Sequence, residues 1–130
     1  MRASAHHKPT VLVIDDTPAV STTLVWVLQE NGYNAAAVPS MAEAVQLCHG
    51  LAPDIALIET SLPDGTGVDT ARQLHRTVPG CRILLMSSDP EAGSYLQQAR
   101  ASGLDCELLP KPIPVAALLE KLQRALAQAA

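Results

Sequence analysis

Short runs of apolar residues recur along this chain of 130 residues, and each run is followed by a segment with apolar positions at helical spacing. Unbroken apolar runs bounded by turn residues are typical of strands that are buried on both faces of a parallel sheet. Apolar residues that recur every three or four positions predict amphipathic helices between these strands. The expected strands cover residues 10–14, 33–38, 54–59, 81–87 and 107–109.

Helix signals separate these runs. Thr17-Pro18 supplies a cap followed by proline in the first turn, and Ser40 with Glu43 three residues later predicts a capping box. Gly32 and Gly50 are expected to end the first two helices. The other expected helices start after the turn at residues 62–67, cover residues 90–102, and start at residues 112–114.

Five strand–helix alternations predict an α/β fold. The expected architecture is a doubly wound, five-stranded parallel sheet of order 2-1-3-4-5 with helices on both faces, as in flavodoxin-like proteins. The length is typical of one domain. We expect an N-terminal extension at residues 1–8 and a single domain over residues 9–127.

Composition narrows the class of protein. The chain is 48% hydrophobic with only three aromatic residues, and its formal net charge is −4 without any basic cluster, so direct nucleic-acid binding is not expected. No run reaches the roughly 18 apolar residues of a membrane span, and the first residues lack the apolar centre of a signal peptide. We expect a cytoplasmic protein without membrane contact, in which Cys48, Cys81 and Cys106 are reduced and buried.

Polar residues follow four of the five expected strands. They are Asp15 and Asp16, Glu59, Ser87 and Lys111. Because the carboxyl ends of neighbouring parallel strands lie along one edge of the sheet, we expect these side chains to converge there. Converging carboxylates favour a hard cation such as Mg²⁺, whereas a hydroxyl and an ammonium complement phosphoryl oxygens. His6 and His7 have no partners at metal-binding spacing, so zinc is not expected.

Four segments carry a resemblance to a known family: VLVIDD (11–16), PDIALIETSLPDGTG (53–67), RILLMSSD (82–89) and LLPKPI (108–113). In these motifs and their order the chain resembles a response-regulator receiver domain of bacterial two-component signalling. The resemblance implies that Asp16 binds Mg²⁺ directly, that Asp15 binds it through water, and that the backbone carbonyl of Ser61 is a further ligand. It also implies that Ser87 senses a phosphoryl group and that Lys111 pairs with it; Ser87 has an equal alternative role as a cap of the fourth helix.

The chain departs from this family at two positions. Glu59 stands where the family has the phosphoacceptor aspartate, and its side chain is longer by about 1.5 Å. Phosphoryl transfer depends on position, so Glu59 is expected to be a poor acceptor whose carboxylate instead reaches toward Ser87 and Lys111. An ion pair between Glu59 and Lys111 would lower Mg²⁺ affinity, whereas a Glu59 that points toward Asp16 would raise it; we expect the first. Leu108 replaces the aromatic residue with which the family usually reads out activation.

The expected function is therefore a receiver module in phosphorelay signal transduction that is not an enzyme and is not phosphorylated in the usual way. Its expected partners are a histidine kinase, a phosphotransfer protein or an effector protein, and the face of helix 4, strand 5 and helix 5 is expected to carry output or a homodimer contact. One alternative is an active Mg²⁺-dependent acceptor that uses Glu59 or a nearby acid such as Asp64. A remote alternative is a flavodoxin-like enzyme for a small phosphorylated substrate, although no further base or nucleophile accompanies the site.

Overall fold

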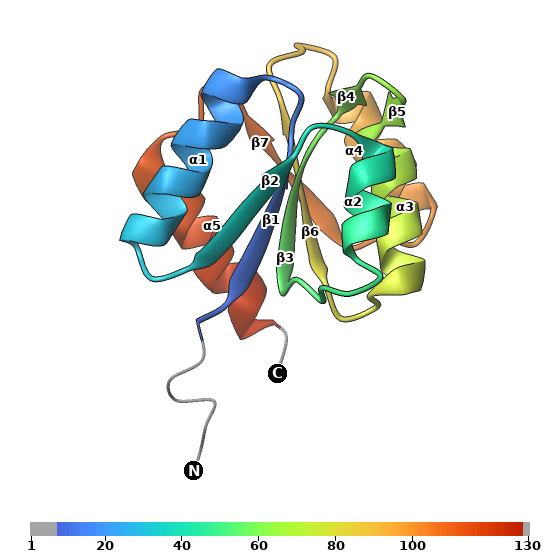
Figure 1. Cartoon of the computed structure of the whole chain (residues 1–130). Helices are drawn as coiled ribbons and strands as arrows, with labels where there is room; N and C mark the ends of the chain where they lie inside the picture. The colour runs from blue at the N-terminus through green and yellow to red at the C-terminus, as the bar shows by residue number, and fades with distance from the viewer. Residues whose placement is uncertain (1–7, 129–130) are drawn as a thin grey trace.

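The computed structural model describes residues 8–128 and has one five-stranded parallel sheet (Figure 1). Its order β2-β1-β3-β6-β7 corresponds to the predicted order 2-1-3-4-5, because the two intervening strands form a separate hairpin. The strands of the main sheet are β1 (Thr10–Ile14), β2 (Asn34–Val38), β3 (Ile55–Glu59), β6 (Arg82–Ser87) and β7 (Cys106–Pro110).

Helices cover both faces of this sheet, as predicted. Figure 1 shows α1 and α5 on one face and α2, α3 and α4 on the other. This division follows from right-handed crossovers on either side of the first strand. The helices are α1 (Pro18–Glu30), α2 (Met41–Leu47), α3 (Gly67–Thr77), α4 (Gly93–Ala101) and α5 (Val115–Ala127).

The core is aliphatic on both sides of the sheet. Along β1, Val11 and Val13 face the cluster under α1 and α5, whereas Leu12 and Ile14 face the cluster under α2, α3 and α4. All four side chains are fully buried. This explains why the strand is an unbroken apolar run, since each of its faces is covered by helices.

Two helix starts differ from each other although both carry a hydroxyl residue. At α2 the prediction is confirmed, because the Ser40 hydroxyl accepts a hydrogen bond from the backbone N–H of Glu43 at 3.2 Å. At α1 the side chain of Thr17 makes no cap bond. Instead the Thr17 N–H donates to Asp15 Oδ1 at 2.9 Å. The predicted side-chain cap at Thr17 is therefore wrong, because the neighbouring carboxylate orders this turn.

The loop after β3 contains a short hairpin where only a turn was expected. Its strands are β4 (Ser61–Leu62) and β5 (Gly65–Thr66). Asp64 lies at the tip, and its two carboxylate oxygens accept hydrogen bonds of 2.9 Å from the N–H groups of Met41 and Ala42 at the start of α2. The hairpin is thereby fastened to a helix more than twenty residues earlier in the chain.

The fourth helix begins later than predicted. The expected range was 90–102, whereas α4 begins at Gly93. The Asp89 side chain accepts from the N–H of Glu91 at 2.8 Å, and the Asp89 carbonyl accepts from the N–H of Ala92 at 3.1 Å. These bonds form a turn that precedes the helix.

Within residues 8–128, no helix is long and apolar enough to cross a membrane. Cys48, Cys81 and Cys106 are buried free thiols, as predicted. His6, His7 and most of the predicted N-terminal extension lie outside the described residues.

Candidate functional site

The sheet brings the predicted polar residues to one edge. Asp15 follows β1, Glu59 is the last residue of β3, Ser87 ends β6, and Lys111 follows β7. Their strands are neighbours in register, with Ile14 beside Ile58, Glu59 beside Met86, and Ser87 beside Pro110. The site is thus a product of strand order, since the residues are far apart in sequence.

Lys111 lies between two carboxylates. Its Nζ donates to Asp15 Oδ2 at 2.6 Å and to Glu59 Oε1. Only 13% of the Lys111 side chain is exposed, compared with 0% for Asp15 and 12% for Glu59. Burial lowers the pKa of Lys111, but the hydrogen bonds and charges of Asp15 and Glu59 outweigh it and the pKa is raised overall. The lysine is therefore a buried ammonium held by two acids.

The second oxygen of Glu59 is bound by its own loop. Oε2 accepts a hydrogen bond from the Thr60 hydroxyl at 3.1 Å and another from the Ser61 N–H at 3.3 Å. The side chain of Thr60 is almost completely buried. Each carboxylate oxygen of Glu59 thus has a donor, which confirms the predicted ion pair with Lys111. The predicted contact with Ser87 is not formed, because Thr60 and Ser61 are the donors to the other oxygen.

A glycine makes room for this arrangement. The Gly67 N–H donates to the Thr60 carbonyl at 2.9 Å where α3 begins. A Cβ at Gly67 would overlap the backbone carbonyl of Glu59 and would come within 3.0 Å of the Thr60 Cα. The start of α3 can therefore lie against the end of β3 only with glycine at this position.

The remaining predicted residues have more local roles. The buried Ser87 hydroxyl accepts from the Asp89 N–H at 3.0 Å, and the Ser87 carbonyl accepts from the Lys111 N–H at 2.8 Å. Ser87 therefore orders the turn before α4. The predicted role as a cap of this helix is wrong, because the N-cap residue is Ala92 and no side chain caps the helix. Leu108 is half-buried in β7 beside Leu85.

The resemblance to receiver domains implies a bound Mg²⁺ ion, which prefers free oxygen ligands. Asp15 is bonded to Thr17 and Lys111, Glu59 has no free carboxylate oxygen, and Asp16 is exposed. In the described part of the chain, no group of three or more His, Cys, Asp or Glu side chains could hold a metal ion. The Lys111 ammonium lies between Asp15 and Glu59, so a divalent cation would compete with it there. The metal roles of Asp15 and Asp16 stay predictions. The role of the Ser61 carbonyl stays a prediction.

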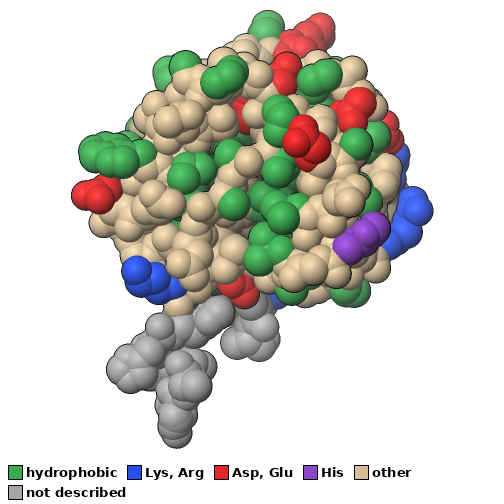
Figure 2. All heavy atoms as spheres, viewed as in Figure 1, with side chains coloured by type: hydrophobic (Ala, Val, Ile, Leu, Met, Phe, Trp, Pro, Cys, Tyr) green, Lys and Arg blue, Asp and Glu red, His purple; other side chains and the backbone are tan. Residues whose placement is uncertain are grey.

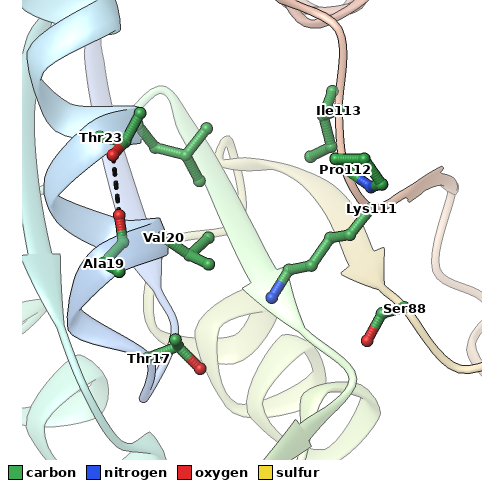
Figure 3. Close-up of a pocket in the computed structure, with 9 residues that line it drawn as sticks. Thr17, Ala19, Val20, Thr23, Ser88, Lys111, Pro112 and Ile113 are labelled. Carbon is green, nitrogen blue, oxygen red and sulfur yellow. Dashed lines mark hydrogen bonds between the residues drawn. The ribbon is translucent and has the colours of Figure 1, made fainter.

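An open cavity of about 600 Å³ lies beside the site, between α1 and the loop that follows β7. Figure 3 shows Val20 on the α1 side and Pro112 and Ile113 on the other, with Lys111 extending between them. The hydroxyls of Thr17 and Ser88 lie nearer the sheet edge in this view. The stem of Lys111 thus borders an apolar hollow while its ammonium is bonded to the carboxylates.

Two contributors to the site, Thr60 and Gly67, were missed in the sequence. Thr60 directly follows the strand, where a hydroxyl residue is common in a loop, and Gly67 lies beside a turn that already contains Gly65. Neither residue therefore stood out in the sequence as part of a site. Asp64 was assigned to a turn or to an alternative acceptor role. Both of its carboxylate oxygens are bonded to α2, which gives it a structural role in this fold.

Comparisons with known proteins agree with this geometry. A family model for the response regulator receiver domain matches residues 11–123. The transcriptional activator protein ExaE of Pseudomonas putida is 32% identical over 119 residues, which cover 90% of this chain and 55% of that protein. The chain spans about half the length of the curated relatives it matches.

Solved structures show the same fold. A CheY-like receiver domain from Methanospirillum hungatei superimposes with a TM-score of 0.83 at 22% identity, over 95% of this chain and 97% of that one. A Burkholderia pseudomallei response regulator with a phosphorylated aspartic acid and a calcium ion gives a TM-score of 0.81 at 26% identity, over 93% and 70%. The chain therefore belongs to the response regulator receiver domain family of two-component systems.

Proposed function

We propose that this receiver domain is a pseudo-receiver, which signals through protein contacts without ordinary phosphorylation at the acceptor position. The observation that carries the proposal is the engagement of Glu59, whose carboxylate oxygens are bonded to Lys111, Thr60 and Ser61. An acceptor must present a free oxygen in line with the incoming phosphorus. Receiver domains are signalling modules and generally not enzymes, and no step of catalysis is assigned to this one.

The charge balance of the pocket supports the same proposal. Two carboxylates, Asp15 and Glu59, surround the single ammonium of Lys111. In this closed network the Glu59 carboxylate takes the place beside Lys111 that a phosphoryl group would take. It carries about one negative charge, compared with roughly 1.5 to 2 for a phosphoryl group. The proposed state of the domain is therefore fixed by the sequence instead of being switched by a kinase.

Phosphate incorporation tests the proposal. We expect acetyl phosphate with Mg²⁺ to leave the wild-type intact mass unchanged, whereas Glu59→Asp should gain the mass of one phosphoryl group. Glu59→Gln is the control that keeps the size of the side chain and removes the nucleophile. Incorporation into the wild type that equals Glu59→Asp and is lost in Glu59→Gln would establish the alternative, an active acceptor at Glu59.

Mg²⁺ affinity is a second consequence of the ion pair. We propose that wild type binds Mg²⁺ more weakly than Glu59→Asp, since the shorter aspartate is withdrawn from its bonds to Lys111 and Thr60. Isothermal titration of both proteins with Mg²⁺ measures the difference directly. Equal affinities would show that the Glu59 contacts do not limit metal binding.

The face formed by α4, β7 and α5 is the proposed output surface, as in related receiver domains that contact histidine kinases and effector domains. Lys121 donates to Glu107 at 2.5 Å, and this bond lowers the pKa of Glu107 together with the nearby charges of Arg124 and Arg100. Three cationic side chains thus surround one acid on a chain whose net charge is negative. An acidic partner surface fits this face by charge, and a homodimer through the same face is the alternative.

A further inference from the structure

The sheet has an open edge at β2. Within the described part of the chain, β2 pairs with β1 and with no other strand. In Figure 1, β2 is the edge strand of the sheet that lies nearest the viewer, between α1 and α2, and neither helix crosses it. The outer side of β2 therefore faces away from the molecule.

The direction of the backbone groups on β2 follows from two hydrogen bonds. The Asn34 N–H donates to the Pro9 carbonyl at 2.9 Å, and the Val38 carbonyl accepts from the Asp15 N–H at 3.1 Å, so both residues face β1. Backbone groups alternate along a strand, so Ala36 also faces β1 while Ala35 and Ala37 present their N–H and C=O groups outward. These outward groups can bond to another extended strand.

This edge lacks the features that usually prevent strand pairing. β2 reads NAAAV, without a charge or a proline, and its side chains are small. The opposite edge strand, β7, contrasts with it: Arg100 donates to the Cys106 carbonyl at 3.3 Å, Glu107 is paired with Lys121, and the strand ends at Pro110. Among the described residues, side chains thus cover the β7 edge of the sheet, whereas no strand pairs with the outer side of β2.

The surface around β2 is also suited to contact. Figure 2, which has the same view as Figure 1, shows apolar side chains across the middle of this face and charged ones mostly toward its rim. Beside the strand, a groove of about 360 Å³ runs along α2, lined by Val38, Ala42, Glu43, Gln46 and Leu47. Side chains that flank an added strand would find room there.

We propose that β2 pairs with β2 of a second copy of this chain, antiparallel and with the twofold axis at Ala36. In this register Ala35 of one copy lies opposite Ala37 of the other, and each such pair exchanges both N–H···O bonds. The two sheets become one continuous sheet through the dimer. This interface is separate from the face of α4, β7 and α5 and goes beyond the proposed pseudo-receiver function.

Two features select a second copy as the occupant. The alanines at 35, 36 and 37 place only small side chains around the axis, so two copies of the strand can approach each other closely. The two ends of β2 also differ in charge. Lys8 lies beside the first residue, Asn34, whose side chain donates to the Lys8 carbonyl at 3.4 Å. Glu43 lies in the first turn of α2, which follows the last residue, Val38. Antiparallel pairing places the lysine end of one copy beside the glutamate end of the other.

Ala37→Pro tests the pairing. Proline is tolerated on an edge strand where the N–H faces outward, so this variant should fold, but it removes the Ala37 donor from both copies. Ala37→Val keeps the N–H and is the matched control. We expect sedimentation equilibrium to show a dimer for wild type and Ala37→Val, with a dissociation constant raised at least about tenfold in Ala37→Pro.

Amide hydrogen exchange identifies the interface in the same proteins. We expect the N–H groups of Ala35 and Ala37 in the wild type to become more protected as concentration rises, while those of Asn34 and Ala36 are protected at every concentration. A wild type that stays monomeric with rapid exchange at Ala35 and Ala37 would overturn the proposal. A dimer that persists in Ala37→Pro and is abolished by Lys121→Glu would also overturn it, because the contact would then lie on the face of α5.

Discussion

Glu59 is the residue at which one methylene changes the role of the whole site. Its carboxylate reaches Lys111 and folds back onto Thr60 and Ser61, so it takes part in a closed set of hydrogen bonds. Buried charges are retained only when they are paired and hydrogen-bonded. Lys111 meets that condition for Glu59 and also for Asp15, which is fully buried.

Lys111→Met should lower the free energy of unfolding by roughly 3 kcal/mol, because it leaves two buried carboxylates without their cation. This value is at the lower end for a buried pair since part of the Lys111 side chain reaches solvent. Urea denaturation measures it. Lys121→Met is the matched control, and its more exposed pair with Glu107 should contribute no more than about 1 kcal/mol. Similar losses in the two variants would contradict the buried role of Lys111.

The same lysine predicts a pH dependence. The pKa of Lys111 is raised in the folded protein from its ordinary 10.5, so its contribution is fully present below that value and is lost as pH rises through the folded pKa. The difference in stability between wild type and Lys111→Met should therefore be constant near neutral pH and should shrink in strong alkali. A difference that grows with rising pH would have the wrong sign.

At the scale of elements, the hairpin of β4 and β5 depends on Asp64. Its carboxylate accepts the first N–H groups of α2 from Met41 and Ala42, and these donors are otherwise unpaired at a helix start. The sequence indicated a turn at Asp64, since Pro63 and Gly65 flank it. A turn signal depends only on neighbouring residues, so it could not show that Asp64 contacts the start of α2.

Asp64→Asn should destabilise the protein and speed hydrogen exchange at Met41 and Ala42, because the amide offers one acceptor and no charge at the helix start. The backbone bonds from Ala42 and Met41 lower the pKa of Asp64, so its contribution is present above 3.8 and is lost as pH falls through the folded pKa. Denaturation at several pH values should show the two proteins converging in acid. Asp105→Asn, in an exposed loop, should match wild type throughout.

Gly67→Ala tests the contact between α3 and β3. The added Cβ would overlap the Glu59 carbonyl, which is backbone and cannot move aside, so we expect a loss of roughly 2–3 kcal/mol in thermal unfolding. Gly65→Ala is the control, because its Cβ would lie 2.9 Å from the end of the flexible Met41 side chain. A larger loss at Gly65 than at Gly67 would contradict this account.

At the scale of the whole molecule, burial keeps the thiols unreactive. Burial, with smaller contributions from the nearby Cys48 and Asp54, raises the pKa of Cys81 to about 12. We expect a thiol reagent to label the native protein only as fast as it opens, with labelling accelerated by urea in proportion to the unfolded fraction. Rapid labelling of Cys81 in native buffer would show that the core is open at this end of the sheet.

Hydrophobic periodicity in the sequence predicted the strands, the helices and the strand ends that carry the polar residues, because these are local properties. The strand order followed from the topology rules of doubly wound sheets, which bring those strand ends to one edge. The sequence did not determine which groups bond there. Lys111 is 52 residues from Glu59 and 96 from Asp15, and nothing local specifies how its ammonium divides between them. The hydrogen bonds between Asp64 and α2, and the unpaired outer side of β2 in the described part of the chain, likewise depend on which elements the fold places side by side. These features become visible only in the folded molecule, since each depends on which distant segments of the chain lie next to each other.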